Sequence, residues 1–77
     1  SYYVLRKGQL VRWIIDYNAF EAYDDSNMVR GIDPIYKYGI IMEVGTDNQS
    51  VVVCCYEKNI SEWVMLNLIH DKFEVLN

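Results

Sequence analysis

The residue types that most often carry out catalysis are sparse in this chain. The single histidine, His70, stands beside Asp71, and the two cysteines, Cys54 and Cys55, are adjacent. Ser61 lies at no spacing from these residues that predicts a base next to a nucleophile, and a lone histidine in a turn usually makes local hydrogen bonds. We therefore expect no catalytic residues and a protein that is not an enzyme.

The two cysteines predict reduced thiols rather than a disulfide. Successive side chains of a strand point to opposite faces, so a bridge between Cys54 and Cys55 would need strained geometry. We expect both to pack as small apolar side chains, which favours a reducing compartment. The chain has no apolar run of the roughly 18 residues that a membrane span needs, and no secretory leader, so we expect no membrane partner and no secretion.

One acidic stretch has the beginnings of a calcium loop. Asp25 and Asn27 are spaced as ligands and Gly31 follows, but the glycine is out of position and Tyr36 stands where a bidentate glutamate is needed. A solvated acidic loop accounts for these residues better. We expect no metal site, and the sequence contains no cofactor-binding motif.

Aromatic and acidic residues form a better candidate for binding. We predict a partner-binding site made of Tyr17, Tyr23, Asp24, Asp25, Tyr36 and Trp63. Acids beside aromatic rings favour a cationic peptide side chain through charge and the ring quadrupole. The alternative is ordinary packing in which the tyrosine hydroxyls reach water.

The net charge of −4 is concentrated in one segment. Between residues 16 and 33 the charged residues are Asp16, Glu21, Asp24, Asp25, Arg30 and Asp33, and acids and bases balance elsewhere. A nucleic-acid-binding barrel that uses Arg6, Lys7, Arg12 and exposed aromatic residues is the alternative function, because phosphates need cations and bases need stacking partners. The isoelectric point near 4.7 disfavours it.

Two apolar runs around a polar turn, from Tyr38 to Tyr56, predict the central hairpin. The strands are expected at residues 9–17, 39–44, 51–56, 60–65 and 73–76. In the first, Val11, Trp13, Ile15 and Tyr17 fall on one face and Leu10, Arg12, Ile14 and Asp16 on the other, and we place the Trp13 face on the core side. Both faces of residues 40–44 are largely apolar, which predicts a bent or bulged strand.

Strand periodicity fades from Asn18 to Lys37, and the segment contains several turn-forming residues. We expect a long acidic loop there, inserted between the first two strands, with one helical turn near Ala19 to Tyr23. A polar turn is expected at residues 57–59, and a 3₁₀ turn at Leu66 to His70 before the last strand. Five short strands separated by turn signals predict an all-β, five-stranded small barrel, with residues 1–77 forming a single domain.

The layout of glycines and core positions resembles the SH3-like small barrels. The matching stretches are Lys7-x-Gly-x-Leu-Val-Arg-Trp13, Tyr38-Gly-Ile-Ile-Met-Glu-Val44, Val51-Val-Val, Trp63-Val64 and Phe73-Glu-Val-Leu76. The layout is similar to that of short proteins of tailed bacteriophages. It is also similar to the small stromal subunit of photosystem I and to the variable chain of ferredoxin:thioredoxin reductase, which are non-catalytic partners of larger assemblies.

The resemblance implies a binding or structural role rather than a catalysed reaction. We expect a non-catalytic interaction or structural accessory protein of a bacteriophage, which binds through the segment 18–37 or through a strand edge. The implied partner is a protein component of the virion or of the host. The implied location is the virion or the cytoplasm of the host cell.

Overall fold

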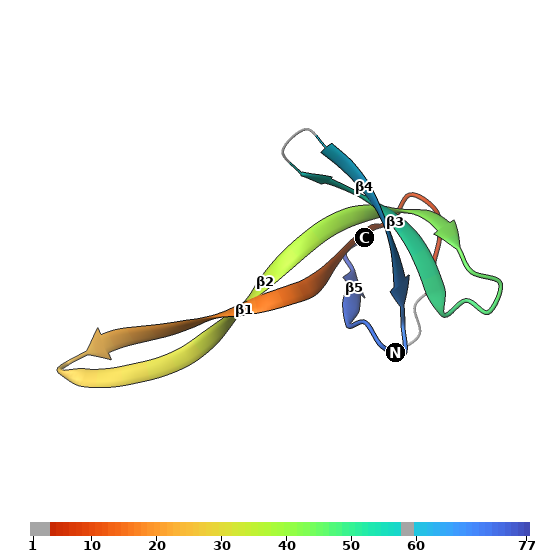
Figure 1. Cartoon of the computed structure of the whole chain (residues 1–77). Helices are drawn as coiled ribbons and strands as arrows, with labels where there is room; N and C mark the ends of the chain where they lie inside the picture. The colour runs from red at the N-terminus through yellow and green to blue at the C-terminus, as the bar shows by residue number, and fades with distance from the viewer. Residues whose placement is uncertain (1–3, 58–59) are drawn as a thin grey trace.

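The computed structural model describes residues 4–57 and 60–77 and is all-β, as predicted. The strands are β1 (Leu10–Asp24), β2 (Asn27–Val44), β3 (Ser50–Glu57), β4 (Ile60–Asn67) and β5 (Phe73–Val75). They form one antiparallel sheet in the order β4-β3-β2-β1-β5 (Figure 1). The sheet is not closed, because β4 and β5 remain its two edges.

The core lies on one side of this sheet and receives side chains from every strand. Its members are Leu5, Val11, Trp13, Ile41, Val51, Val53, Cys55, Leu66 and Phe73. The two edge strands contribute Leu66 and Phe73 to the same cluster, so the sheet curls around it. The Trp13 ring covers Gly39, where a Cβ atom would lie 3.3 Å from the ring and 2.9 Å from the carbonyl oxygen of Cys54. The packing therefore needs a glycine there.

The chain ends are tied together beside the core. The buried Gln9 accepts a hydrogen bond from the Arg6 amide at 2.6 Å and donates one to the carbonyl oxygen of Asn77 at 3.3 Å. The amide of Leu10 donates to Oδ1 of Asn77 at 2.7 Å. These bonds satisfy a buried polar side chain, which would otherwise destabilise the fold.

The segment predicted as a long loop is instead a β-hairpin. Residues 16–35, which we call the arm, continue β1 and β2 as an antiparallel ribbon paired as far as Asp24 and Asn27. Asp25 (φ 49°) and Ser26 (φ 72°) close it in a two-residue turn, and two left-handed residues are typical of a hairpin turn whose twist matches its strands. The predictions of a loop at 18–37 and of a helical turn near Ala19 to Tyr23 are therefore wrong.

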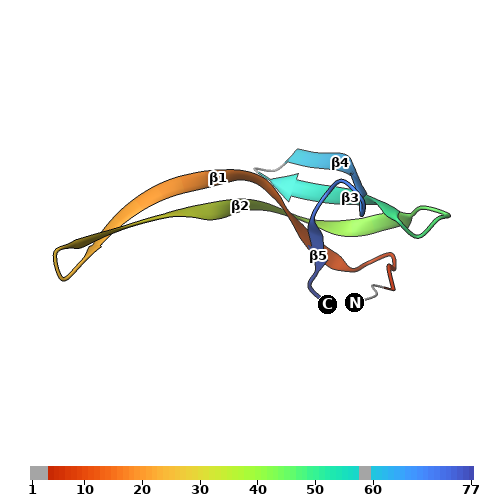
Figure 2. The ribbon, with the colours of Figure 1, turned by 90° about the horizontal axis from the view of Figure 1, so that it is seen from below.

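The arm projects from the rest of the sheet, which we call the body (Figures 1 and 2). The molecule measures 53 × 34 × 21 Å and its radius of gyration is 16.0 Å. A compact domain of this length would have a radius of gyration of about 11 Å. Every residue from Ile15 to Arg30 is exposed, so most of the arm lies in solvent.

A β-bulge at Ile15 separates the arm from the body. Ile14 pairs with Tyr36 and Asp16 with Ile35, so β1 carries one extra residue at this point. The bulge shifts the alternation of β1, and the prediction that Ile15 and Tyr17 face the core with Val11 and Trp13 is wrong: both are exposed. Residues 40–44 were expected to form a bent or bulged strand, and the β2–β3 register shows a bulge between Ile41 and Glu43.

The connections near the C-terminus also differ from expectation. Leu66 and Asn67 belong to β4, so the turn expected at Leu66 to His70 begins two residues later, at Leu68. In that turn the amides of His70 and Asp71 donate to the carbonyl oxygen of Asn67 at 3.1 and 2.7 Å. The polar turn expected at residues 57–59 lies largely outside the described residues.

Adjacent residues of β2 provide a test of which side of the sheet holds the core. Ile41 is fully buried whereas Ile40 is 47% exposed on the opposite face. We expect Ile41→Ala to lower the free energy of unfolding by about 2–5 kcal/mol because it leaves a cavity, and Ile40→Ala by less than about 1 kcal/mol. Urea denaturation measures both. Similar losses would contradict the assigned core.

The turn of the arm is strained at Ser26, because a side chain disfavours its left-handed backbone. Ser26→Gly should raise the opening free energy of the arm by about 1 kcal/mol. Asp24→Gly, at an ordinary strand position, should lower it. Hydrogen exchange of the arm amides measures both effects, and greater protection in the Asp24 variant would rule out the assigned turn.

Candidate functional site

The side of the sheet that faces away from the core carries a continuous ladder of side chains along β1 and β2. We call each cross-strand pair on this outer face a rung. From the body to the tip of the arm, the seven rungs are Leu10–Ile40, Arg12–Tyr38, Ile14–Tyr36, Tyr17–Pro34, Ala19–Ile32, Glu21–Arg30 and Tyr23–Met28. The bulge at Ile15 keeps the ladder continuous, because it places Tyr17 on the same face as Ile14.

Most rungs present apolar side chains to solvent. Tyr23 is 74% exposed and Ile32 65%, and Tyr17, Met28, Tyr38 and Ile40 are exposed as well. Folded monomers rarely leave apolar side chains in contiguous patches, and such patches mark binding surfaces. The outer face is therefore the strongest candidate for a functional site.

The apolar surface continues across the body. Leu10, Ile40, Cys54 and Trp63 form one row over four strands, and Trp63 is 61% exposed. Met65, which pairs with Val52 in the next row, is also exposed. An antiparallel sheet with one wet face normally alternates apolar and polar residues. Here both faces are apolar.

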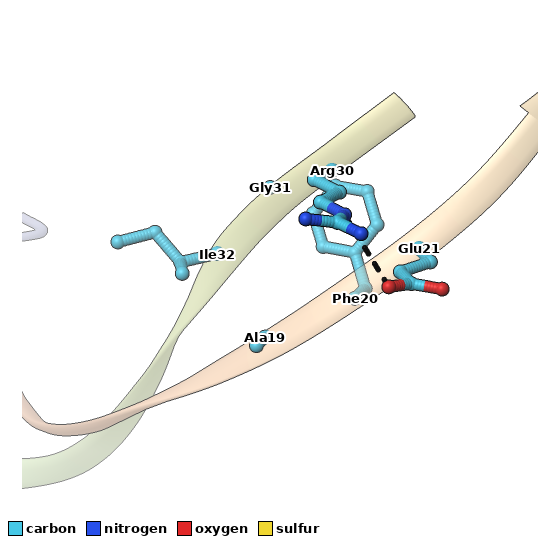
Figure 3. A pocket seen from close by; sticks show the side chains of 6 residues that line it. All are labelled: Ala19, Phe20, Glu21, Arg30, Gly31 and Ile32. Carbon is cyan, nitrogen blue, oxygen red and sulfur yellow. Dashed lines mark ion pairs between the residues drawn. The ribbon is translucent and has the colours of Figure 1, made fainter. Parts of the chain in front are cut away.

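The charged residues of the rungs are neutralised by close partners. Glu21 and Arg30 form a cross-strand ion pair at 3.4 Å (Figure 3), and Arg12 bonds Glu74 of β5 at 3.1 Å. The Arg12 guanidinium also lies 4.1 Å from the centre of the Tyr36 ring. Hydrogen bonding to Tyr38 and then to Glu74 raises the pKa of Arg12, which keeps it charged. The seven rungs together with Glu74 carry no net charge.

The opposite face of the arm is acidic. Strand alternation places Asp16, Asp24 and Asp33 on this face, and Asp25 lies in the turn next to it. Phe20 covers Gly31, where a Cβ atom would fall within 2.5 Å of the ring. The arm thus separates an apolar, neutral face from an acidic face that carries the excess charge of the protein.

The structure distributes the predicted site residues along the sheet. Tyr17, Tyr23, Tyr36 and Trp63 lie on the outer face, Asp24 lies on the acidic face, and Asp25 in the turn. Met28, which pairs with Tyr23, is eight residues from Tyr36 along β2, about 27 Å in a strand. The six residues therefore do not gather into one pocket. Their role in binding stays a prediction.

Sequence reasoning missed the contribution of β2 to this face. Every second residue of β2 lies on it: Met28, Arg30, Ile32, Pro34, Tyr36, Tyr38 and Ile40. This period of two is a strand signal, but the intervening Gly31 and Asp33, together with Pro34, indicated a loop. Proline fits here because β2 has no second neighbour beside it in the arm.

A hollow also lies in the arm, around Phe20, Arg30 and Gly31 (Figure 3). Only a two-stranded ribbon bounds it, so it is an open depression without walls that would enclose a small molecule. His70 is exposed. Within residues 4–57 and 60–77, no group of three or more His, Cys, Asp or Glu side chains is placed to hold a metal ion.

Comparisons with protein-family models, with curated proteins and with solved structures find no match to this chain. Within the part of the chain that the structure describes, no helix is long and apolar enough to cross a membrane.

The two thiols should react at very different rates. Burial raises the pKa of the Cys55 thiol, whereas Cys54 is partly accessible on the outer face. At pH 8 we expect a disulfide reagent to label Cys54 rapidly, and native Cys54→Ser protein to label at least about tenfold more slowly.

The raised pKa of the Cys55 thiol also makes the stability of the fold depend on pH. A raised thiol pKa favours folding below the ordinary value of 9.0, and this contribution is lost as the pH rises through the folded-state pKa. Cys55→Ala should therefore flatten the alkaline fall in stability measured by thermal unfolding. Rapid labelling of Cys55 in the native protein would contradict its burial.

Proposed function

We propose that this protein is a non-catalytic interaction module, built on an SH3-like barrel, that binds a protein partner through its outer face. The observation that carries the proposal is the arm: a two-stranded ribbon with a row of exposed apolar side chains on one face. A face of this kind would bind a partner that has a complementary shape and an apolar surface.

The energetics of the arm support a binding role. An isolated two-stranded hairpin is marginally stable in water, and this one is exposed at every residue from 15 to 30. Tyr17, Tyr23 and Ile32 are more than half exposed, and covering each would contribute on the order of 1 kcal/mol. A partner on the outer face would therefore both order the arm and bind through it.

The strand order supports the SH3-like assignment. β1 lies between β2 and the short β5, and both edge strands contribute to one core, as in a small barrel left open between β4 and β5. The fold by itself assigns no activity. We propose that the module has a structural or adaptor role. The phage resemblance implies that its partner is a protein of the virion or of the host.

A nucleic-acid-binding role has less support from the geometry. Arg12 is held by Glu74 and stacked on Tyr36, so its charge is already neutralised. Arg6 and Lys7 lie outside the strands, and the arm carries an excess of acids that would repel phosphates. Titration of single-stranded DNA at low salt tests this alternative, and tight binding at low salt would support a nucleic-acid-binding role.

Shortening the arm tests the proposed function. Replacing residues 19–32 by Asn-Gly closes a two-residue turn at the Asn18–Asp33 pair and leaves the body unchanged. We expect this variant to keep its thermal stability within about 1 kcal/mol. Its association with proteins that co-purify with the tagged full chain from its native cells should fall at least about tenfold.

Ser26→Gly, which alters only the tip turn, is the matched control and should bind at least as tightly as the original chain, because it stabilises the arm. Undiminished association of the shortened variant would count against binding through the arm.

A further inference from the structure

We propose that the edge of β1 in the arm binds an extended basic segment of a partner protein as an additional antiparallel strand. We call this edge, which lies along residues 16–24 and faces away from β2, the open edge. The backbone of the segment would bond that of β1, and its basic side chains would face Asp16 and Asp24. The proposed function concerns the outer face of the sheet, whereas this inference concerns its edge, so each can fail without the other.

β5 occupies only the beginning of this side of β1. It pairs with β1 at Val11, Arg12 and Trp13, and the chain enters β5 from a turn at residues 68–70 instead of running along the arm. The arm extends beyond β5 in both views, and in the described parts of the chain no strand pairs with the open edge (Figures 1 and 2). A side of β1 that already takes one antiparallel strand therefore continues without one along the arm.

Hydrogen bonds in the body show which backbone groups of β1 point to this side. The carbonyl oxygen of Leu10 accepts a bond from the Leu76 amide at 2.8 Å, so Leu10 faces the β5 side. The carbonyl oxygen of Gln9 accepts instead from the Ile41 amide of β2 at 2.9 Å. Alternate residues of an antiparallel strand bond opposite neighbours, so the residues with outer-face side chains direct their amides and carbonyls to the β5 side.

The same alternation continues in the arm. There the outer-face residues of β1 are Tyr17, Ala19, Glu21 and Tyr23. The pairing of Tyr17 with Pro34 agrees with this assignment, because proline fits where the N–H of a strand would point away from its neighbour. The amide of Tyr17 bonds the side chain before it. Ala19, Glu21 and Tyr23 thus direct their amides and carbonyls to the open edge, as strand addition requires.

Charge selects the kind of strand that this edge would take. Asp16 and Asp24 lie at its two ends on the acidic face, and within residues 4–57 and 60–77 no cation forms an ion pair with either. Opposite charges on neighbouring strands stabilise the pair when they lie directly across from each other. We therefore expect the bound segment to carry basic residues eight positions apart, with apolar residues next to them beside Tyr17 and Tyr23.

The same acids disfavour a second copy of β1 as the added strand. Two copies paired antiparallel along the whole open edge would be centred on Phe20, and Asp16 of each would lie directly opposite Asp24 of the other. Like charges in this position are destabilising. Charged residues commonly protect exposed edges from self-association in this way, and a basic segment would not meet this repulsion.

The shape of the arm permits strand addition and favours the β1 edge over the β2 edge. An added strand follows the twist of the ribbon that it joins, so it needs no flat surface. On the β2 edge the outward positions include Arg30, Ile32 and Pro34, and Pro34 has no N–H to donate. A strand added to β2 would therefore lose a bond that the open edge of β1 provides.

A synthetic peptide tests the recognition. The probe is a nonapeptide with lysine at both ends, valine beside each lysine and threonine between, so its lysines can face Asp16 and Asp24. Amide chemical shifts of β1 should saturate with a dissociation constant below about 1 mM. At about 5 mM peptide, solvent exchange of the Ala19, Glu21 and Tyr23 amides should slow at least about fivefold. The same peptide with glutamate at both ends should not bind.

Matched prolines on one rung test the edge. Ala19→Pro removes an amide from the open edge, and Ile32→Pro removes one from the β2 edge. Neither amide bonds the other strand of the ribbon, so the arm should keep its pairing, which circular dichroism checks. Ala19→Pro should weaken binding of the lysine peptide at least about tenfold, and Ile32→Pro less than about threefold.

Reversing the charges provides a test that does not depend on the prolines. The double variant Asp16→Lys and Asp24→Lys should bind the glutamate peptide and should bind the lysine peptide at least about tenfold more weakly than the original chain does. A purely structural role of the two acids would not exchange the preference for one peptide for the other.

Three results would overturn the open edge as a binding site: no shifts with about 5 mM lysine peptide, equal effects of the two prolines, or equal binding of both peptides to the original chain. If the peptide does not bind but the shortened arm still loses the co-purifying proteins, the proposed function stands without this inference. If the peptide binds but shortening the arm leaves that association undiminished, the open edge stands and the proposed function fails.

Discussion

The extra residue at Ile15 determines which side chains of the arm face which way. β1 runs in register with β2 on both sides of this bulge, but its alternation changes there by one residue. With regular alternation, Tyr17, Ala19 and Tyr23 would continue the core side of β1. The bulge instead joins them to the outer face of the body, where their neighbours on β2 are Pro34, Ile32 and Met28. A single insertion thus produces one continuous apolar ladder rather than two unrelated patches.

The bulge also separates the charges. Because Tyr17 faces outward, its neighbours Asp16 and Asn18 face the other way, and the acids of the arm collect on the side that continues the core. The two charged rungs that remain on the outer face are neutralised by ion pairs at 3.1 and 3.4 Å. Apolar surface without net charge can be covered at little electrostatic cost, whereas a charged face would have to be desolvated.

The body and the arm differ in what stabilises them. The body is held by a core that includes Val11, Ile41 and Val53, all fully buried, and by chain ends that are tied through Gln9. The ribbon of the arm has its cross-strand bonds, one exposed ion pair and the Phe20–Gly31 contact, which together contribute little in water. Stability is therefore concentrated in the body, whereas the arm is the less stable end of the molecule and carries the exposed apolar side chains.

The amino-acid pattern alone determined the all-β class, the central hairpin of β2 and β3, an irregular (bent or bulged) strand at residues 40–44, and the concentration of acids between residues 16 and 33. These features depend on local alternation and composition, which can be read along the chain. The arm could not be predicted in this way, because Asp33, Pro34 and Gly31 are turn formers that an unpaired edge of a ribbon also tolerates. Only the tertiary structure decided that Tyr17 and Ile32 share a face with Tyr36 and Trp63. Which residues share a face depends on the register between strands and on one bulged residue. Register is a property of the paired sheet rather than of either strand alone.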